Sequence, residues 1–166
     1  MKIIYKSKYG AAEKYAEMLG KTLSCEVIDL KKAAKGETDV IFVGAVYGGE
    51  IRGFDKLVKK SIRPVAVFCV GATAPTDGLA ESIKRDNFTA DMNDIPLFYG
   101  RGAWEESSFC FSDRMLCKIV RSMAKKNPDG MNDSMKFMVS LMGEDHDWTD
   151  EKYLLPIEEY IGATSK

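Results

Sequence analysis

The chain has 166 residues, a length that suits one domain with its own hydrophobic core. Hydrophobic residues make up 45% and charged residues 30%, which excludes a disordered or fibrous chain and is typical of a globular protein. The 24 basic and 25 acidic residues give a formal net charge of −1, which argues against a dedicated nucleic-acid-binding protein. We therefore expect a single domain over residues 1–166 and no nucleic-acid partner.

Membrane-spanning and metal-binding patterns are missing from the sequence. No run of about 18 apolar residues is present, so we expect no transmembrane segment. Residues 1–6 lack the long apolar core of a signal peptide, which favours a cytoplasmic protein with free thiols. The four cysteines include no Cys-x-x-Cys pair, and we predict no metal site.

Short apolar segments alternate with helical patterns through the first half of the chain. Apolar residues at helical spacing predict helices that begin at Ala12 and at Phe54. The apolar runs are continuous rather than alternating, which is typical of parallel strands covered by helices on both faces. This order of elements predicts an α/β fold with three layers. The predicted strands are 2–5, 26–30, 40–44, 64–71 and 95–100.

The second half of the chain is predicted to be mostly helical. Apolar residues at helical spacing over 115–123 indicate one helix, and the turn-forming residues 127–130 should end it. A short helix or an irregular covering segment is expected over 131–142. Thr149 is a candidate N-cap for a last helix, in which Pro156 either makes a kink or occupies the first turn.

The loop after the first strand is a candidate phosphate site. In an open α/β sheet, ligands bind at the carboxyl ends of the strands. Residues 7–12 join a predicted strand to a helix, whose N-terminal N–H groups and dipole favour an anion. The alternative is an ordinary turn in which Ser7 acts as a local cap. Neither a Walker A motif nor a Gly-x-Gly-x-x-Gly fingerprint follows the first strand, which argues against those nucleotide-binding folds.

The loops after the third and fourth strands could flank a planar ligand. In the third loop, Tyr47 precedes Gly48 and Gly49, so a flat ring could approach the backbone closely and stack on the tyrosine. The fourth loop, over residues 71–75, is small and carries no charge. The alternatives are a packing role for Tyr47 and a plain connection for the fourth loop.

The sequence leaves the roles of several other residues undecided. His146, the single histidine, is a candidate proton relay or metal ligand, although an exposed residue with neither role is the simpler interpretation. Trp104 could shield a ligand edge, although a hydrophobic cover residue is the simpler interpretation. The methionines over 115–142 could form an adaptable partner surface or part of the core. The basic residues of the same segment could face an acidic redox partner or a membrane surface, or form an ordinary solvated face. No residue stands out as a catalytic acid, base or nucleophile.

The first loop resembles that of the flavodoxin family, and the third loop and the acidic stretch near the C-terminus resemble those of a flavodoxin-like subgroup. Residues 5–14, with Ser7 and Gly10, resemble the family's phosphate loop, written Ser/Thr-x-Thr-Gly-x-Thr. Residues 145–150, which include Trp148, resemble an acidic stretch of the flavodoxin-like subgroup that includes the menaquinone-dependent protoporphyrinogen oxidase. The resemblance implies a flavodoxin-like three-layer sandwich with a five-stranded parallel sheet in the order 2-1-3-4-5.

The resemblance also implies non-covalent FMN binding. Tyr9 and Ala12 stand where the family has threonines. Each hydroxyl donor that is lost would weaken FMN binding by about an order of magnitude. The implied phosphate-binding residues are Ser7, Lys8, Tyr9, Gly10, Ala11 and Ala12, and those flanking the isoalloxazine are Val46, Tyr47, Gly48, Gly49, Gly71, Ala72 and Thr73.

These inferences lead to two hypotheses about function. The first is an FMN-dependent electron-transfer protein or oxidoreductase, whose partner is a redox protein or a quinone, with peripheral membrane contact left open. The sequence does not decide between an enzyme and an electron carrier. The second is a flavodoxin-fold domain without FMN that acts as a protein-binding module.

Overall fold

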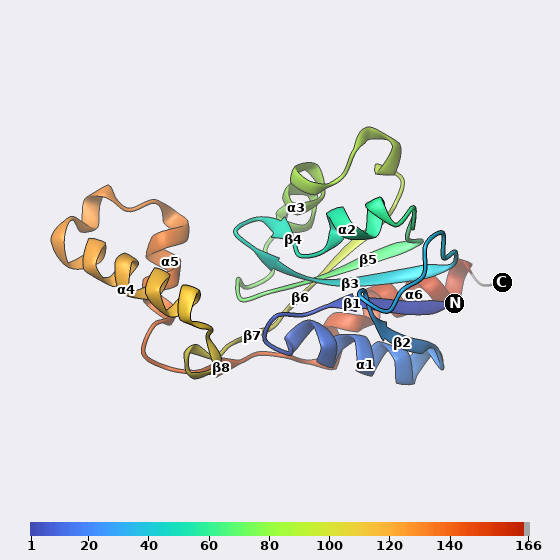
Figure 1. The fold of residues 1–166 in the computed structure, drawn as a ribbon, viewed down its shortest axis with the longest axis horizontal. Coiled ribbons are helices and arrows are strands. Elements are labelled where there is room, and N and C mark those ends of the chain that lie inside the picture. The colour runs from blue at the N-terminus through green and yellow to red at the C-terminus, as the bar shows by residue number, and fades with distance from the viewer. Residues whose placement is uncertain (165–166) are drawn as a thin grey trace. The chain divides into compact units, whose positions relative to one another are not determined.

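A parallel β-sheet forms the centre of the computed structural model, which describes residues 1–164 (Figure 1). The strand order is β2-β1-β3-β5-β6, and each neighbouring pair is parallel. A short strand, β4 (Glu50–Ile51), pairs antiparallel with β3 outside this path. The predicted order 2-1-3-4-5 of the parallel strands is therefore confirmed. The parallel strands are β1 (Lys2–Lys6), β2 (Glu26–Asp29), β3 (Val40–Tyr47), β5 (Ala66–Gly71) and β6 (Leu97–Arg101).

Helices cover both faces of this sheet (Figure 1). One face packs against α2 (Phe54–Lys59) and α3 (Leu79–Asn87), which is followed by the short 3-10 helix η1 (Ala90–Met92). The other face packs against α1 (Ala11–Leu23) and α6 (Leu155–Thr164). The three-layer α/β prediction is confirmed, although the sequence analysis gave no helix at the position of α3.

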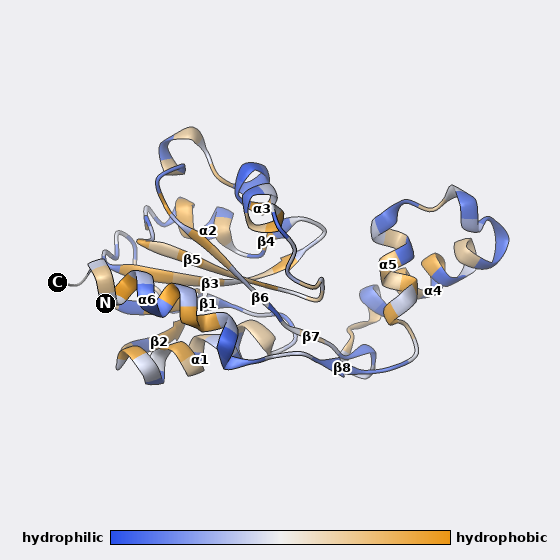
Figure 2. Ribbon diagram, turned by 180° about the vertical axis from the view of Figure 1, so that it is seen from behind, coloured by the Kyte–Doolittle hydropathy of each residue, from blue (hydrophilic) through white to orange (hydrophobic). Residues whose placement is uncertain are grey.

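The alternation of side chains along each strand explains why both faces of the sheet are buried. Ile3 and Ile4 are neighbours in β1, and neither side chain is exposed to solvent. Ile4 packs with Phe42 on the face of α2, whereas Ile3 and Phe68 pack on the face of α1. Figure 2 shows hydrophobic residues concentrated along β3, β5 and β6. The continuous apolar runs in the sequence therefore correspond to strands buried on both faces.

Residues 103–147 form a second compact unit, and the first unit consists of residues 1–102 with the segment that begins at Trp148. Two short strands of this second unit, β7 (Ala103–Trp104) and β8 (His146–Asp147), pair antiparallel with each other. The expected single domain over 1–166 stays a prediction. The helices of the second unit are η2 (Glu106–Ser108), α4 (Phe111–Lys126), η3 (Pro128–Gly130) and α5 (Asp133–Leu141).

The last helix begins differently from the sequence prediction. The Asp150 side chain accepts a hydrogen bond from the Lys152 N–H at 2.9 Å, which makes Asp150, not Thr149, the N-cap of the 3-10 helix η4 (Glu151–Leu154). The Thr149 hydroxyl instead accepts a hydrogen bond from Lys14 Nζ. Pro156 lies in the first turn of α6, where its missing N–H costs no intrahelical hydrogen bond.

Within residues 1–164, no helix is both long enough and apolar enough to cross a membrane. The four cysteines are present as thiols. Cys69 and Cys117 are buried, as expected for small hydrophobic residues, whereas Cys110 is exposed.

Candidate functional site

The loop between β1 and α1 presents a helix N-terminus at the carboxyl end of the sheet. Gly10 is the N-cap of α1, with a φ of 94° that favours glycine, and it has no side chain to cap the helix. The Ser7 Oγ accepts a hydrogen bond from the Gly10 N–H at 2.9 Å, within the loop that precedes α1. The Ser7 hydroxyl hydrogen can still be donated to a ligand. This arrangement is suited to an anion, because the positive end of the helix dipole and the unpaired N–H groups of the first turn both lie at the helix N-terminus.

The remaining residues of the first loop contribute in different ways. Ala12 is fully buried among the core residues of α1 and offers no exposed surface to a ligand. Ala11, at the first position of α1, is half-buried. Lys8 is exposed, and its Nζ lies 5.2 Å from the centroid of the Tyr9 ring. The loop therefore places a cation near the helix N-terminus.

The third loop is a tight hairpin between β3 and β4, which the sequence did not indicate. β3 continues to Tyr47, so Val46 and Tyr47 belong to the strand, and their partners in β4 are Ile51 and Glu50. Gly48 and Gly49 form the turn with φ values of 62° and 87°, a conformation that two-residue hairpins require. A Cβ atom added at either glycine would meet nothing within 4 Å, so their backbone borders open space.

Two cations flank the ring of Tyr47 and connect the first and third loops. Lys8 Nζ and Arg52 Cζ each lie 4.9 Å from the centroid of this ring, whose residue is 39% exposed. Cations over an aromatic ring are held there by its quadrupole. The tyrosine thus presents an aromatic surface within a positively charged part of the site.

The fourth loop is held by donors from the end of β6. The Gly102 N–H, Arg101 Nε and the Tyr99 hydroxyl donate hydrogen bonds to the carbonyls of Gly71, Ala72 and Thr73 at 2.8, 2.9 and 2.9 Å, respectively. Burial raises the pKa of Tyr99, so its phenol stays protonated and remains a donor. The predicted strand order places β6 beside β5, but nothing in the sequence indicates the register that brings these three donors to residues 71–73.

The segment that follows residue 147 returns to the same edge of the sheet. The Arg101 guanidinium lies 3.6 Å from the centroid of the Trp148 ring, and the Trp148 N–H donates to the Gly102 carbonyl at 3.0 Å. Lys14 in α1 donates to the Thr149 hydroxyl. Trp148 and Thr149 therefore support the residues that flank the first and fourth loops.

Tyr15 connects α1 to both of these segments, and we predict a stability loss when its hydroxyl is removed. The hydroxyl donates to the Arg101 carbonyl at 2.6 Å and accepts from the Asp150 N–H at 3.1 Å, on a fully buried side chain. Tyr15→Phe should lower the free energy of unfolding by about 1–3 kcal/mol, because two backbone groups lose their partner. Urea denaturation measures this loss, and an unchanged midpoint would contradict it.

Tyr5 gives a prediction about alkaline pH. Its hydroxyl donates to Glu13 Oε1, and this hydrogen bond, with burial, raises the pKa of Tyr5 to about 12. The unfolded phenol ionises near pH 10. The stabilisation is complete below pH ~10 and is lost as the pH rises towards ~12, since the folded chain then binds more protons than the unfolded chain. Tyr5→Phe should therefore weaken the fall in stability across this range, as measured by urea midpoints at successive pH values. An identical fall in both proteins would contradict this prediction.

The other residues singled out from the sequence lie in the second unit. His146 is in β8, opposite Trp104 of β7, and the Trp104 ring contacts Phe109 with centroids 4.9 Å apart. Two cavities also lie in this unit, at α4 and beside Arg121. Residues 1–164 contain no group of three or more side chains suited to hold a metal ion.

The order of the parallel strands and the loops at their carboxyl ends define a doubly wound α/β protein with a candidate phosphate-binding loop. A family model described as a flavodoxin domain matches residues 2–130. The chain therefore belongs to the flavodoxin-domain family. Comparison with curated proteins gives no match.

Proposed function

We propose that this protein binds FMN at the carboxyl edge of its parallel sheet and functions in electron transfer. The observation that carries the proposal is the N-terminus of α1, where Gly10 leaves the first N–H groups uncapped by a side chain. FMN, when bound, supplies one- or two-electron redox chemistry. Flavodoxin-domain proteins typically bind FMN, and membership of that family supports the proposal.

The residues at this edge fit the parts of FMN. The Ser7 hydroxyl and the backbone N–H of Ala11, at the start of α1, would bind the phosphate, with Lys8 contributing positive charge. The backbone at Gly48 and Gly49 borders open space, which leaves room for a flat ring beside the hairpin. Val46, Tyr47 and residues 71–73 would flank the isoalloxazine, and the donors from β6 keep residues 71–73 in one conformation.

The test compares FMN with riboflavin, which has the same ring system and no phosphate. We expect FMN to bind at least about 100-fold more tightly, because two or more hydrogen bonds to a charged phosphate are each worth about 1.5–3 kcal/mol. Binding is measured by quenching of flavin fluorescence during titration of the purified protein. Equal affinities for FMN and riboflavin would show that the first loop does not bind the phosphate. If neither flavin binds, the whole proposal is wrong.

The redox partner is proposed to be a protein or a quinone. This part rests on the resemblance of residues 145–150 to the subgroup that includes the menaquinone-dependent protoporphyrinogen oxidase. Trp148 of this stretch supports Arg101, which in turn holds the Ala72 carbonyl. The stretch would therefore act on the loop beside the flavin. Reoxidation of the reduced protein by a soluble quinone, followed by absorbance, tests this part separately.

The second candidate function is a protein-binding module without FMN. It is favoured by the Tyr9 side chain, which replaces a hydroxyl donor of the family's loop, and by the methyl group of Ala12, which is buried in the core. A protein that stays colourless after incubation with excess FMN and desalting would favour this alternative.

A further inference from the structure

Helix α4 of the second unit has three distinct faces. At 3.6 residues per turn, Asp113, Cys117 and Val120 fall on one face, and these residues are buried. A second face carries large hydrophobic side chains that are exposed, with Phe111 79% and Ile119 51% accessible. The exposed hydrophobic residues of α4 are Phe111, Met115, Leu116, Ile119 and Met123, which we call the apolar stripe.

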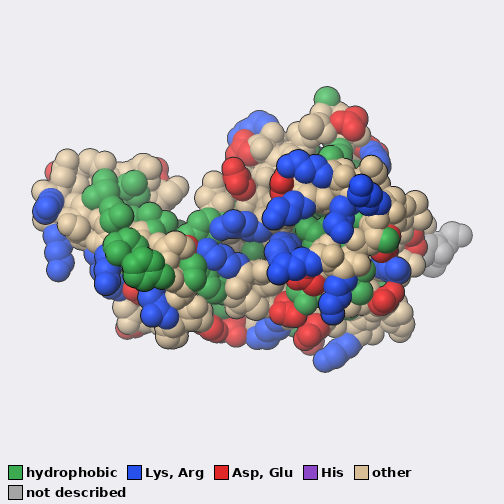
Figure 3. All heavy atoms as spheres, in the orientation of Figure 1, with side chains coloured by type: hydrophobic (Ala, Val, Ile, Leu, Met, Phe, Trp, Pro, Cys, Tyr) green, Lys and Arg blue, Asp and Glu red, His purple; other side chains and the backbone are tan. Residues whose placement is uncertain are grey.

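Basic residues follow one edge of the apolar stripe. Arg114, Lys118, Arg121 and Lys125 recur at the helical spacing i, i+4, i+7 and i+11, and Lys126 ends the helix. The one acidic residue of α4 is Asp113, which lies on the buried face, so the exposed charges of this helix are all positive. Figure 3 shows hydrophobic side chains gathered over the segment that carries α4, with Lys and Arg side chains beside them.

The excess of positive charge on α4 is a local feature of this helix, because the whole chain has a formal net charge of −1. Arg121 is paired with Glu106 at 2.9 Å, which leaves Arg114, Lys118, Lys125 and Lys126 as the exposed basic residues of α4. An exposed hydrophobic stripe with a row of cations on its flank is the pattern of helices that lie in the interface of a negatively charged membrane.

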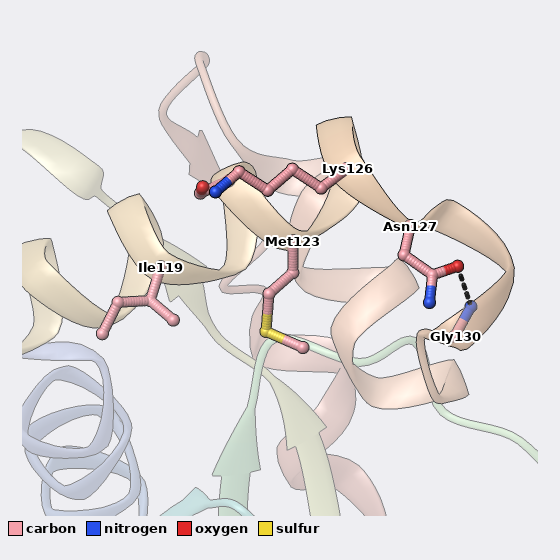
Figure 4. A pocket seen from close by; sticks show the side chains of 6 residues that line it. Ile119, Met123, Lys126, Asn127 and Gly130 are labelled. Carbon is pink, nitrogen blue, oxygen red and sulfur yellow. Dashed lines mark hydrogen bonds between the residues drawn. The ribbon is translucent and has the colours of Figure 1, made fainter.

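A cavity of about 300 Å³ continues the apolar stripe towards the end of α4. Ile119 and Met123 line it together with Lys126, and Asn127 closes its end through a hydrogen bond from the Gly130 N–H at 3.2 Å (Figure 4). Hydrophobic side chains beside one cation match the chemistry of an acyl chain below a phosphate headgroup. An acidic protein surface would match the cations, but it would not match the exposed hydrophobic side chains of the apolar stripe.

We propose that α4 docks this protein on the surface of an anionic phospholipid bilayer, with the apolar stripe in the headgroup region and the basic row against lipid phosphates. This interaction is peripheral and reversible, since it depends on one helix face and a few charges. It is independent of flavin binding, because it uses residues of the second unit alone.

The experiment is sedimentation of the full chain with phospholipid vesicles. We expect binding to vesicles that contain phosphatidylglycerol, weaker binding as salt is raised, and little binding to pure phosphatidylcholine. The double substitution Lys118→Gln with Lys125→Gln should weaken binding about fivefold per cation, or about 25-fold together. Phe111→Ala with Ile119→Ala should weaken it at least about tenfold, because less hydrophobic surface enters the interface.

Matched control variants change the same residue types elsewhere. Lys31→Gln with Lys32→Gln removes two exposed cations of the first unit, and Val58→Ala with Val65→Ala trims two exposed hydrophobic residues there. Both controls should bind vesicles as the wild type does. Circular dichroism of each variant establishes that the helix content is unchanged.

Three outcomes would overturn the proposal. They are the absence of binding to anionic vesicles, equal binding to neutral and anionic vesicles, and equal losses in the controls and in the α4 variants. Binding to poly-glutamate that survives Phe111→Ala with Ile119→Ala, without any vesicle binding, would instead assign α4 to an acidic protein partner.

Discussion

Replacing Ser7 with aspartate should weaken FMN binding by at least about 100-fold. Ser7 Oγ accepts the Gly10 N–H at 2.9 Å, at the N-terminus of α1 where the proposed phosphate site lies. An aspartate can accept the same hydrogen bond, but it brings a negative charge against the phosphate. Two like unit charges about 4 Å apart repel by about 4 kcal/mol at an effective dielectric constant near 20. Titration of the variant with FMN, followed by fluorescence quenching, measures the loss.

Ser7→Asn is the matched control for this substitution. Asparagine has nearly the shape of aspartate and can also accept the Gly10 N–H, but it carries no charge. We expect it to retain FMN binding within about tenfold of the wild type, because it loses only the hydroxyl donor. If Ser7→Asp and Ser7→Asn bind FMN equally well, the phosphate does not lie at this loop. Riboflavin affinity should be nearly unchanged in both variants.

Phe68→Ala should lower the free energy of unfolding by about 3–5 kcal/mol. Phe68 lies in β5 with no exposed surface, and its ring centroid is 5.1 Å from that of Tyr15 in α1. A Cβ atom added at Gly100 would come within 2.6 Å of the Phe68 ring, so this glycine leaves the space that the ring fills. The alanine variant leaves a cavity between the sheet and α1 that the close packing cannot close. Such a loss is a large part of the ~5–15 kcal/mol stability of an ordinary domain.

Two further variants separate cavity formation from a general effect of substitution. Phe68→Leu keeps most of the buried volume and should cost clearly less than Phe68→Ala. Val58→Ala changes an exposed residue of α2 and should change stability by less than about 0.5 kcal/mol. Urea denaturation of the three variants measures these differences. Equal losses for Phe68→Ala and Val58→Ala would contradict the packing around Phe68.

The sequence by itself determined the central sheet. Strands buried on both faces must be apolar at every position, and the runs over 40–44 and 64–71 showed this directly. The helical spacing of apolar residues likewise predicted α1, α2 and α4, and the breaker residues at 127–130 marked the end of α4. These features are local, because each depends on residues within a few positions of one another in the chain.

The first loop of the candidate site was also found from local residues. A serine and a glycine between a strand and a helix indicated a turn with an exposed helix N-terminus, and the structure has Ser7 and Gly10 in that arrangement. The sequence did not predict that Gly48 and Gly49 form the turn of a hairpin, because β4 is only two residues long and has no periodic pattern of its own. The role of residues 7–12, 46–49 and 71–73 in binding a cofactor stays a prediction.

Only the tertiary structure decided which residues support the site. Arg101 and Tyr99 lie far from residues 71–73 in sequence, and they reach them because β6 pairs with β5 in one register. Trp148 contacts Arg101 because the segment after residue 147 returns to that edge. The tertiary structure also decided that α4 has an exposed hydrophobic face, since helical spacing alone does not separate a core-facing stripe from a solvent-facing one. The spacing of apolar residues shows which residues share a face of a helix or strand. What covers each face depends on contacts between residues that are distant in the chain.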